Sequence, residues 1–193
     1  MQTKAIILDL YGTLLYSEYK ARPYLNLFKN IGLTKEEMNY WTDRVMTKNY
    51  GYLQEIVDEM KPGQFVYTTQ FEHDIHKEIE STQLFDDTIQ VLETLSKKYK
   101  LYLLSNIATP YKECVFNLGI DKYFDKLFFS CDIEYRKPQP EAFEMVIKHS
   151  GLQPKQLLMI GDSKRSDYEG ALNSGVKAIL KDKPLNLLLS EIN

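Results

Sequence analysis

The sequence predicts an α/β fold, in which a Rossmann-like three-layer sandwich with a mainly parallel sheet carries an inserted helical-bundle cap. The first observation is the apolar run at residues 5–8, which is typical of a strand buried on both faces. The second is the alternation of strand-like and helix-like segments after residue 85, which favours parallel strands joined by helical crossovers. The third is a long helical stretch between them, which indicates an insertion.

Each expected element follows from its own pattern. The expected strands are apolar runs that stop at polar or glycine residues, namely 5–8, 100–104, 126–129, 156–160 and 176–180. The expected helices of the sheet domain are one from Asp86 or Asp87 through Leu95, then 110–118, 140–149 and 166–173, with a short C-terminal helix within 184–192.

The insertion shows apolar residues at helical spacing in four segments, 24–31, 38–45, 53–60 and 71–79. Thr34 followed by Glu37 is a capping-box signature at the start of the second segment. We therefore predict a core domain of residues 1–16 plus 82–193 and a helical cap domain of residues 17–81.

Composition limits the classes of partner. The 193 residues are 44% hydrophobic and 26% charged with a formal net charge of -3, so no broad basic surface for nucleic acid or anionic lipid is expected. No long apolar run suggests a membrane span, and Cys114 and Cys131 are too few for a disulfide framework. We expect a cytoplasmic protein, a monomer or homodimer that binds neither nucleic acid nor membrane.

Polar residues follow the expected strands where their carboxyl ends share one edge of the sheet. In open α/β sheets this edge forms the ligand crevice. Asp9 at this edge could act as a nucleophile, serve as a metal ligand or simply cap a turn. The other residues expected at this edge are Ser105, Asn106, Lys137, Asp162 and Asp167.

The chemistry of these side chains points to a phosphate and a metal ion. Asp9 and Asp162 offer the hard oxygen ligands that Mg²⁺ prefers. Ser105 and backbone amides near Gly12 can donate hydrogen bonds to phosphate oxygens. Lys137 supplies a positive charge for a nucleophile and a phosphoryl group together.

Four segments in order resemble the motifs of the haloacid dehalogenase (HAD) superfamily. They are DLYGTL at 9–14, LSN at 104–106, RKPQP at 136–140 and GDSKRSD at 161–167. The insertion resembles the cap of the subfamily that includes phosphoglycolate phosphatase, β-phosphoglucomutase and the 2-haloacid dehalogenases.

The resemblance implies that Asp9 attacks phosphorus, forms an aspartyl-phosphate and works with Lys137 as the catalytic pair. It also implies a Mg²⁺ cofactor and a small phosphorylated substrate. The implied metal-site residues are Asp9, the carbonyl of Tyr11, Asp162 and Asp167, and the implied substrate-binding residues are Tyr11, Gly12, Thr13, Ser105 and Asn106.

Tyr11 departs from the phosphatase pattern, in which this position is a second aspartate that acts as acid and base. A phenol with an ordinary pKa of about 10 replaces that group poorly at neutral pH. Tyrosine at this position resembles the metal-free dehalogenases, for which Arg22 or Arg44 would have to receive halide. Against that reading, Phe143 stands where dehalogenases usually have tyrosine.

Electrostatics decides between the two signals. The grouping of Asp9, Asp162 and Asp167 without a cation would raise the pKa of at least one carboxyl group, so a metal site fits better. The sequence therefore favours a slow Mg²⁺-dependent phosphatase. A 2-haloacid dehalogenase and a non-catalytic phosphate- or partner-binding HAD scaffold stay as alternatives.

Overall fold

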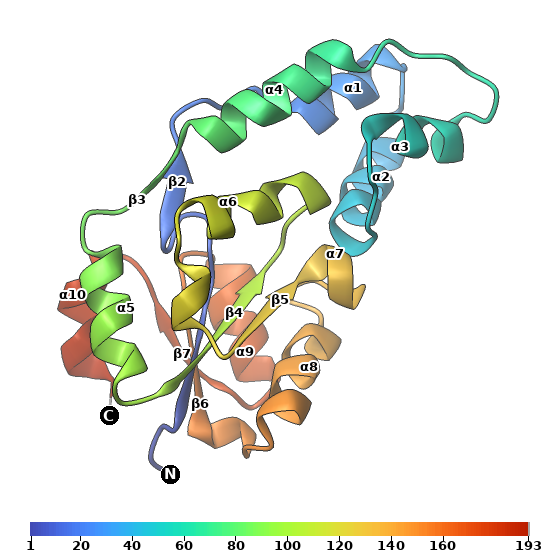
Figure 1. The fold of residues 1–193 in the computed structure, drawn as a ribbon. Coiled ribbons are helices and arrows are strands. Elements are labelled where there is room, and N and C mark those ends of the chain that lie inside the picture. Colours follow the sequence, from blue (N-terminus) through green and yellow to red (C-terminus); the bar gives the residue numbers. More distant parts are fainter. Residues whose placement is uncertain (193) are drawn as a thin grey trace.

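A five-stranded parallel sheet forms the centre of the protein in the computed structural model, which describes residues 1–192 (Figure 1). The strand order is β5-β4-β1-β6-β7, so β1 lies in the middle with β4 and β6 on its two sides. The strands are β1 (Ala5–Leu8), β4 (Lys100–Ser105), β5 (Lys126–Phe129), β6 (Leu157–Gly161) and β7 (Lys177–Leu180).

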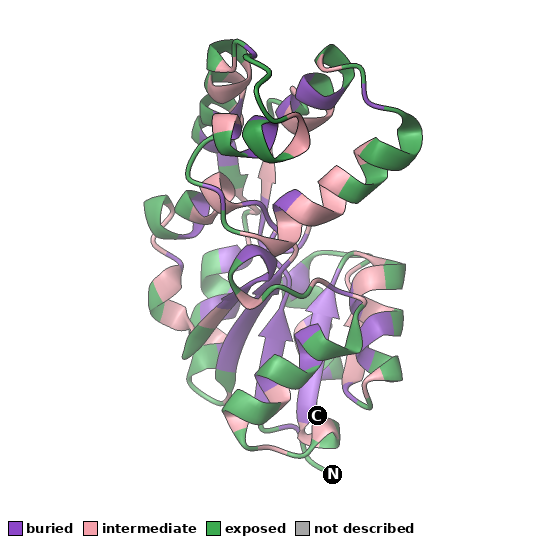
Figure 2. Ribbon diagram, turned by 90° about the vertical axis from the view of Figure 1, so that its right-hand side faces the viewer, coloured by how far each residue is buried: buried purple, intermediate pink, exposed green. Residues whose placement is uncertain are grey.

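Helices cover both faces of this sheet, because alternate residues of each buried strand point to opposite sides. In β1, Ile6 and Leu8 belong to one apolar cluster, whereas Ala5 and Ile7 belong to the other. The first cluster includes residues of α5 (Thr88–Ser96), α6 (Glu113–Asn117) and α10 (Leu185–Leu188), and the second those of α8 (Pro140–Ser150) and α9 (Gly170–Asn173). Figure 2 shows the buried strands between the two helical layers. The predicted three-layer sandwich is confirmed.

A helical layer stands above the carboxyl ends of the strands (Figure 1). It contains α1 (Pro23–Asn30), α2 (Lys35–Thr47), α3 (Leu53–Met60) and α4 (Thr69–Glu80). The chain enters and leaves it through β2 (Leu15–Ser17) and β3 (Thr82–Leu84), which pair antiparallel. The sequence analysis did not predict this ribbon. The division of the chain into domains at residues 16/17 and 81/82 stays a prediction.

Local structure corrects several element predictions. The helix expected at 110–118 begins as a 3-10 turn (Thr109–Lys112) before α6, and the helix expected at 166–173 begins as a π-helix (Lys164–Glu169) before α9. A further helix, α7 (Ser130–Ile133), was not predicted. The remaining 3-10 turns are Asp121–Tyr123, Pro154–Gln156 and Leu189–Glu191.

The expectation that an aspartate side chain caps the start of α5 is wrong. Asp87 stands at the N-cap position, but its side chain makes no capping hydrogen bond. Its Oδ2 instead accepts from the backbone N–H of Asn186 at 2.9 Å, which ties the C-terminal α10 to this helix. Across residues 1–192, the helices are too short or too polar for any of them to traverse a bilayer.

The capping box of α2 is confirmed and gives a stability prediction. Thr34 Oγ1 accepts from the N–H of Glu37 at 3.2 Å, and Glu37 Oε2 accepts from the N–H of Thr34 at 2.7 Å. Thr34→Ala should lower the free energy of unfolding by about 1 kcal/mol, because the N–H of Glu37 loses its acceptor at the helix start. Urea denaturation measures this change.

A suitable control is Thr94→Ala, because the Thr94 hydroxyl bonds only to the Gln90 carbonyl within its own helix. This variant should leave stability unchanged or slightly raised. Equal losses in the two variants would contradict the role given to the capping box.

Candidate active site

The middle of the sheet brings the motif residues to one edge. Asp9 directly follows β1, and its N–H still donates to the carbonyl of Ile160 in β6 at 3.0 Å. Ser105 is the last residue of β4, and Asp162 follows the last residue of β6. Because β4 and β6 both pair in parallel with β1, these positions meet above the same strand ends.

A buried ion-pair network organises this edge. The ammonium of Lys137 lies 2.6 Å from Asp9 Oδ1 and 2.7 Å from Asp167 Oδ1. The side chains of Lys137 and Asp167 are 1% and 2% exposed, so water screens these charges little. One cation thus joins the loop after β1 to the π-helix after β6.

Backbone contacts hold both partners of this network in place. The Asn106 carboxamide accepts from the N–H of Lys137 at 2.8 Å and donates to its carbonyl at 2.7 Å. Asp167 Oδ2 accepts from the N–H of Ser163 at 2.9 Å. Asn106 therefore positions the lysine loop, while its expected contact with substrate stays a prediction.

Three carboxylates form a group of metal-ligand type. One oxygen each of Asp9, Asp162 and Asp167 lies within 4.8 Å of the others. Asp162 is exposed on the open side of the group, whereas the other two side chains are buried. It is the one group of three or more His, Cys, Asp or Glu side chains with such spacing in residues 1–192.

Two glycines allow this close packing of carboxylates. A Cβ on Gly12 would lie 2.3 Å from Asp162 Oδ2, and one on Gly161 would lie 2.3 Å from Asp167 Oδ2. Gly12 also has a φ of +82°, a left-handed conformation that L side chains rarely adopt. Glycine is thus required at position 12 for two independent reasons.

The donor set fits Mg²⁺. All three side chains present hard carboxylate oxygens, and Lys137 neutralises only part of their charge. Asp167 Oδ1 meets Lys137 as an ion pair without a well-directed hydrogen bond, so it keeps capacity for another partner. A divalent cation would balance the negative charge that is left.

The pKa values reflect the same crowding. Burial raises the pKa of Asp9 to about 6, although the ammonium of Lys137 works in the opposite direction. Burial also raises the pKa of Asp162, and the nearby carboxylate of Asp167 adds to this effect. Burial alone would lower the pKa of Lys137, but Asp9 and Asp167 outweigh it and raise that pKa.

Tyr11 stands where most phosphatases of the resembling family have a second aspartate, and its hydroxyl group already has a hydrogen-bond partner. This hydroxyl lies 3.1 Å from Cys114 Sγ, and the ring packs edge-on to Tyr111 at 6.3 Å between centroids. Burial first, and then the contact with Cys114, raise the pKa of the phenol. Proton transfer at neutral pH is therefore even less accessible to Tyr11 than to a free tyrosine.

The remaining predicted residues lie at the same edge. Thr13 is buried, and its hydroxyl donates to Asp9 Oδ2 at 3.3 Å. Ser105 is 2% exposed at the end of β4. Of the two arginines considered for halide, Arg44 is engaged by Glu59 at 3.0 Å, whereas Arg22 lines the cleft described next.

A cleft of about 650 Å³ lies between the sheet edge and the helical layer. It is reached by residues of the loop after β1, of α1, α2 and α4, and of the segment after β4. Its lining includes Tyr11, Gly12, Lys20, Arg22, Tyr24, Glu78, Asn106, Tyr111 and Asp162.

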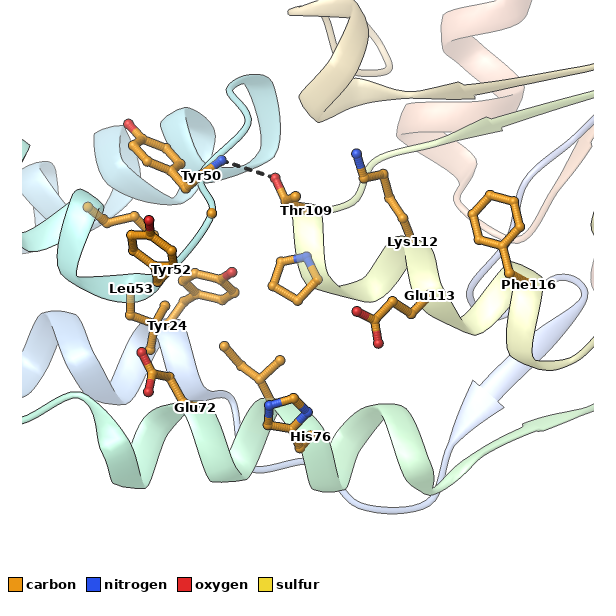
Figure 3. A pocket seen from close by; sticks show the side chains of 14 residues that line it. Tyr24, Tyr50, Tyr52, Leu53, Glu72, His76, Thr109, Lys112, Glu113 and Phe116 are labelled. Carbon is orange, nitrogen blue, oxygen red and sulfur yellow. Dashed lines mark hydrogen bonds between the residues drawn. The ribbon is translucent and has the colours of Figure 1, made fainter.

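Tyr24 also borders a second cavity of about 570 Å³, which contains none of the motif residues. Figure 3 shows this cavity between α3 and α4 on one side and the Thr109–Phe116 segment on the other. Tyr50 of its wall donates its backbone N–H to Thr109 Oγ1 at 3.2 Å. Four of the motif residues, Tyr11, Gly12, Asn106 and Asp162, line the first cleft.

Two residues of the cleft lining, Glu78 and Tyr111, were not predicted, and neither was the contact of Tyr11 with Cys114. Glu78 of α4 accepts the hydroxyl hydrogen of Tyr111 and also the N–H of Arg22, the latter at 2.9 Å. Cys114 was interpreted only as one of two free cysteines. None of Glu78, Tyr111 and Cys114 stands in a motif, because their contacts join segments far apart in the chain.

Comparison with known proteins establishes the family. The model of the haloacid dehalogenase-like hydrolases matches residues 3–175, so this chain belongs to that family. Glyceraldehyde 3-phosphate phosphatase of Methanothermobacter thermautotrophicus is 32% identical over 99 residues, which cover 51% of this chain and 44% of that protein. Pyrophosphatase PpaX of Bacillus cereus is 31% identical over 124 residues, which cover 63% of this chain and 56% of that protein. The matches span about half the length of these relatives.

Solved structures share the fold. A HAD family enzyme from Bacteroides thetaiotaomicron, in complex with magnesium and inorganic phosphate, superposes with a TM-score of 0.72 at 22% identity and covers 97% of this chain and 99% of that chain. A HAD phosphatase from Thermococcus onnurineus gives 0.62 at 23% identity, with 95% and 90% covered. The subfamily of the cap stays a prediction.

The close approach at Gly12 gives a test of the carboxylate group. Gly12→Ala should weaken Mg²⁺ binding by at least about tenfold, because the new methyl group displaces Asp162. Isothermal titration calorimetry with MgCl₂ measures this affinity.

Gly32→Ala is the matched control, since Gly32 has a nearly equal φ of +79° but nothing within 4 Å of a built Cβ. It carries the same backbone strain without the clash. If both variants bind Mg²⁺ as the wild type does, Asp162 is not a ligand of the ion.

Proposed function

We propose that this protein is a Mg²⁺-dependent phosphatase that acts on a small phosphorylated metabolite through an aspartyl-phosphate on Asp9. The observation that carries the proposal is the carboxylate group of Asp9, Asp162 and Asp167 with Lys137 bound between two of its members. The names of the phosphatase relatives and the magnesium and phosphate in a structural neighbour support the same chemistry.

Asp9 is suited to attack phosphorus because the two nearest donors hold its carboxylate. Lys137 contacts Oδ1 and Thr13 contacts Oδ2, so the side chain is oriented before substrate binds. Asp9, Asp162 and Asp167, with the carbonyl of Tyr11, would hold Mg²⁺, which supplies charge stabilisation for the phosphoryl oxygens. Ser105 at the end of β4 would donate to those oxygens.

The first step forms a bond from an Asp9 oxygen to phosphorus and breaks the bond to the leaving oxygen. Water then attacks the phosphorus of the aspartyl-phosphate, which releases inorganic phosphate and restores the Asp9 carboxylate. Both steps lack an acid or base from Tyr11, since its hydroxyl group faces Cys114. Turnover should therefore be slow and should favour aryl and acyl phosphates, whose leaving groups need little protonation.

Two release assays distinguish a phosphatase from a dehalogenase and from a non-catalytic scaffold. Phosphate release from p-nitrophenyl phosphate should require Mg²⁺, and it should fall to background with EDTA or in Asp9→Asn, because each removes part of the reacting centre. A chloride-release assay on 2-chloropropionate runs beside it. Halide release that persists in EDTA would select a dehalogenase, and silence in both assays would select a non-catalytic phosphate- or partner-binding scaffold.

Substitution of Tyr11 tests whether a missing general acid and base limits turnover. Tyr11→Asp should raise hydrolysis of alkyl phosphates by roughly 10²-fold, the gain that a positioned general acid and base usually gives. Tyr11→Phe is the control, because it keeps the ring and removes only the hydroxyl bound to Cys114. It should hydrolyse the same substrates at the wild-type rate.

Steady-state rates together with circular dichroism decide the outcome. A folded Tyr11→Asp protein without any gain would overturn this explanation of slow turnover.

Both cysteines are buried and free, which fits a reducing compartment such as the cytoplasm.

A further inference from the structure

Two cations and two carboxylates line the catalytic cleft, namely Lys20, Arg22, Glu78 and Asp162. Asp162 belongs to the carboxylate group that would hold the metal ion. Glu78 already accepts from the Tyr111 hydroxyl and from the Arg22 backbone N–H.

The two cations are left without a charged partner. Within residues 1–192, neither the Lys20 ammonium nor the Arg22 guanidinium makes an ion pair or a side-chain hydrogen bond. Arg44, Lys48 and Arg136 of neighbouring segments, in contrast, are all paired with carboxylates. The positive charge of Lys20 and Arg22 is therefore available to a ligand.

The start of α1 adds no carboxylate of its own beside the two cations. Arg22 adopts a left-handed conformation with a φ of 56°, uncommon for a residue other than glycine, and its N–H is held by Glu78. Helix α1 follows at once, without a capping side chain or an acidic residue in its first turn. No nearby carboxylate in the first turn of α1 offsets the two side chains.

The transferred phosphoryl group does not need these cations. In the proposed function its charge is met by Lys137 and by the metal ion at Asp9, Asp162 and Asp167, on the sheet side of the cleft. Lys20 and Arg22 come instead from the segment that leads into α1. The cleft of about 650 Å³ has room for a substrate that is longer than a phosphate ion.

We propose that Lys20 and Arg22 bind a second anionic group of the substrate, a carboxylate or a second phosphate that lies away from the transferred phosphoryl group. This inference rests on the proposed phosphatase activity and specifies its substrate class. Both residues are specificity determinants, because they act on the part of the substrate that does not react. Apolar side chains of the same cleft, such as Leu25 and Val45, contact the carbon skeleton between the two anions.

The test compares substrates that differ in the remote group. Ethyl phosphate has no second anion, 2-phosphoglycolate has a carboxylate, and 1,3-propanediol bisphosphate has a second phosphate. For 2-phosphoglycolate, the bisphosphate or both, the wild type should show a kcat/KM about tenfold to a hundredfold above that for ethyl phosphate. This is the range that a charge-assisted hydrogen bond gives. The better of the two identifies the anion.

Lys20→Gln and Arg22→Gln should remove this preference mainly through KM. Lys29→Gln is the matched control, because Lys29 lies in the last turn of α1, which follows Arg22, and does not line the cleft. Arg22→Lys should restore part of the preference, since it returns the positive charge.

Binding gives a second readout that does not depend on turnover. Calorimetry with the Asp9→Asn protein and MgCl₂ should show 2-phosphoglycolate or the bisphosphate binding more tightly than ethyl phosphate, and Lys20→Gln should abolish the difference. Equal kcat/KM and equal affinity for all three substrates, or a preference that survives in both variants, would overturn the inference. An absence of p-nitrophenyl phosphate hydrolysis would instead overturn the proposed function.

Discussion

The ion pairs of Lys137 with Asp9 and Asp167 are the interaction on which the site depends. They join the loop after the central strand, the loop before α8 and the π-helix after β6. Since the ammonium is almost wholly buried, its removal would leave two buried carboxylates uncompensated at a cost of about 3–5 kcal/mol. The same contact fixes the position of Asp9, the proposed nucleophile. Stability of the core and readiness for catalysis thus share one side chain.

The helical layer and the sheet edge together form the cleft. The core holds the three carboxylates and Lys137, whereas the segment before α1 supplies Lys20 and Arg22, which are unpaired within residues 1–192. Glu78 links the two parts, because it accepts from Tyr111 of the core and from the backbone of Arg22. In the proposed function, chemistry and substrate choice therefore reside in different layers of the molecule.

Sequence patterns predicted the sheet and the gathering of Asp9, Lys137 and Asp162 because a buried strand and its carboxyl end are local signals. They did not predict the β2–β3 ribbon, since three-residue strands separated by the whole helical layer have no local period. The hydroxyl of Tyr11 meets Cys114 through packing across 103 residues, which no motif encodes. The π-helix at Asp167 was also missed, because such wider turns are rare and these sequence patterns do not distinguish them from an α-helix.

The most direct measurement of the central claim is a crystal structure of the protein soaked with Mn²⁺ and inorganic phosphate, with anomalous diffraction recorded at the manganese edge. Manganese is the reporter because it takes the same oxygen ligands as magnesium. We expect one anomalous peak coordinated by Asp9, Asp162, Asp167 and the Tyr11 carbonyl, with phosphate between that ion and Lys137. A peak elsewhere, or an intact carboxylate group that holds no metal at saturating Mn²⁺, would contradict it.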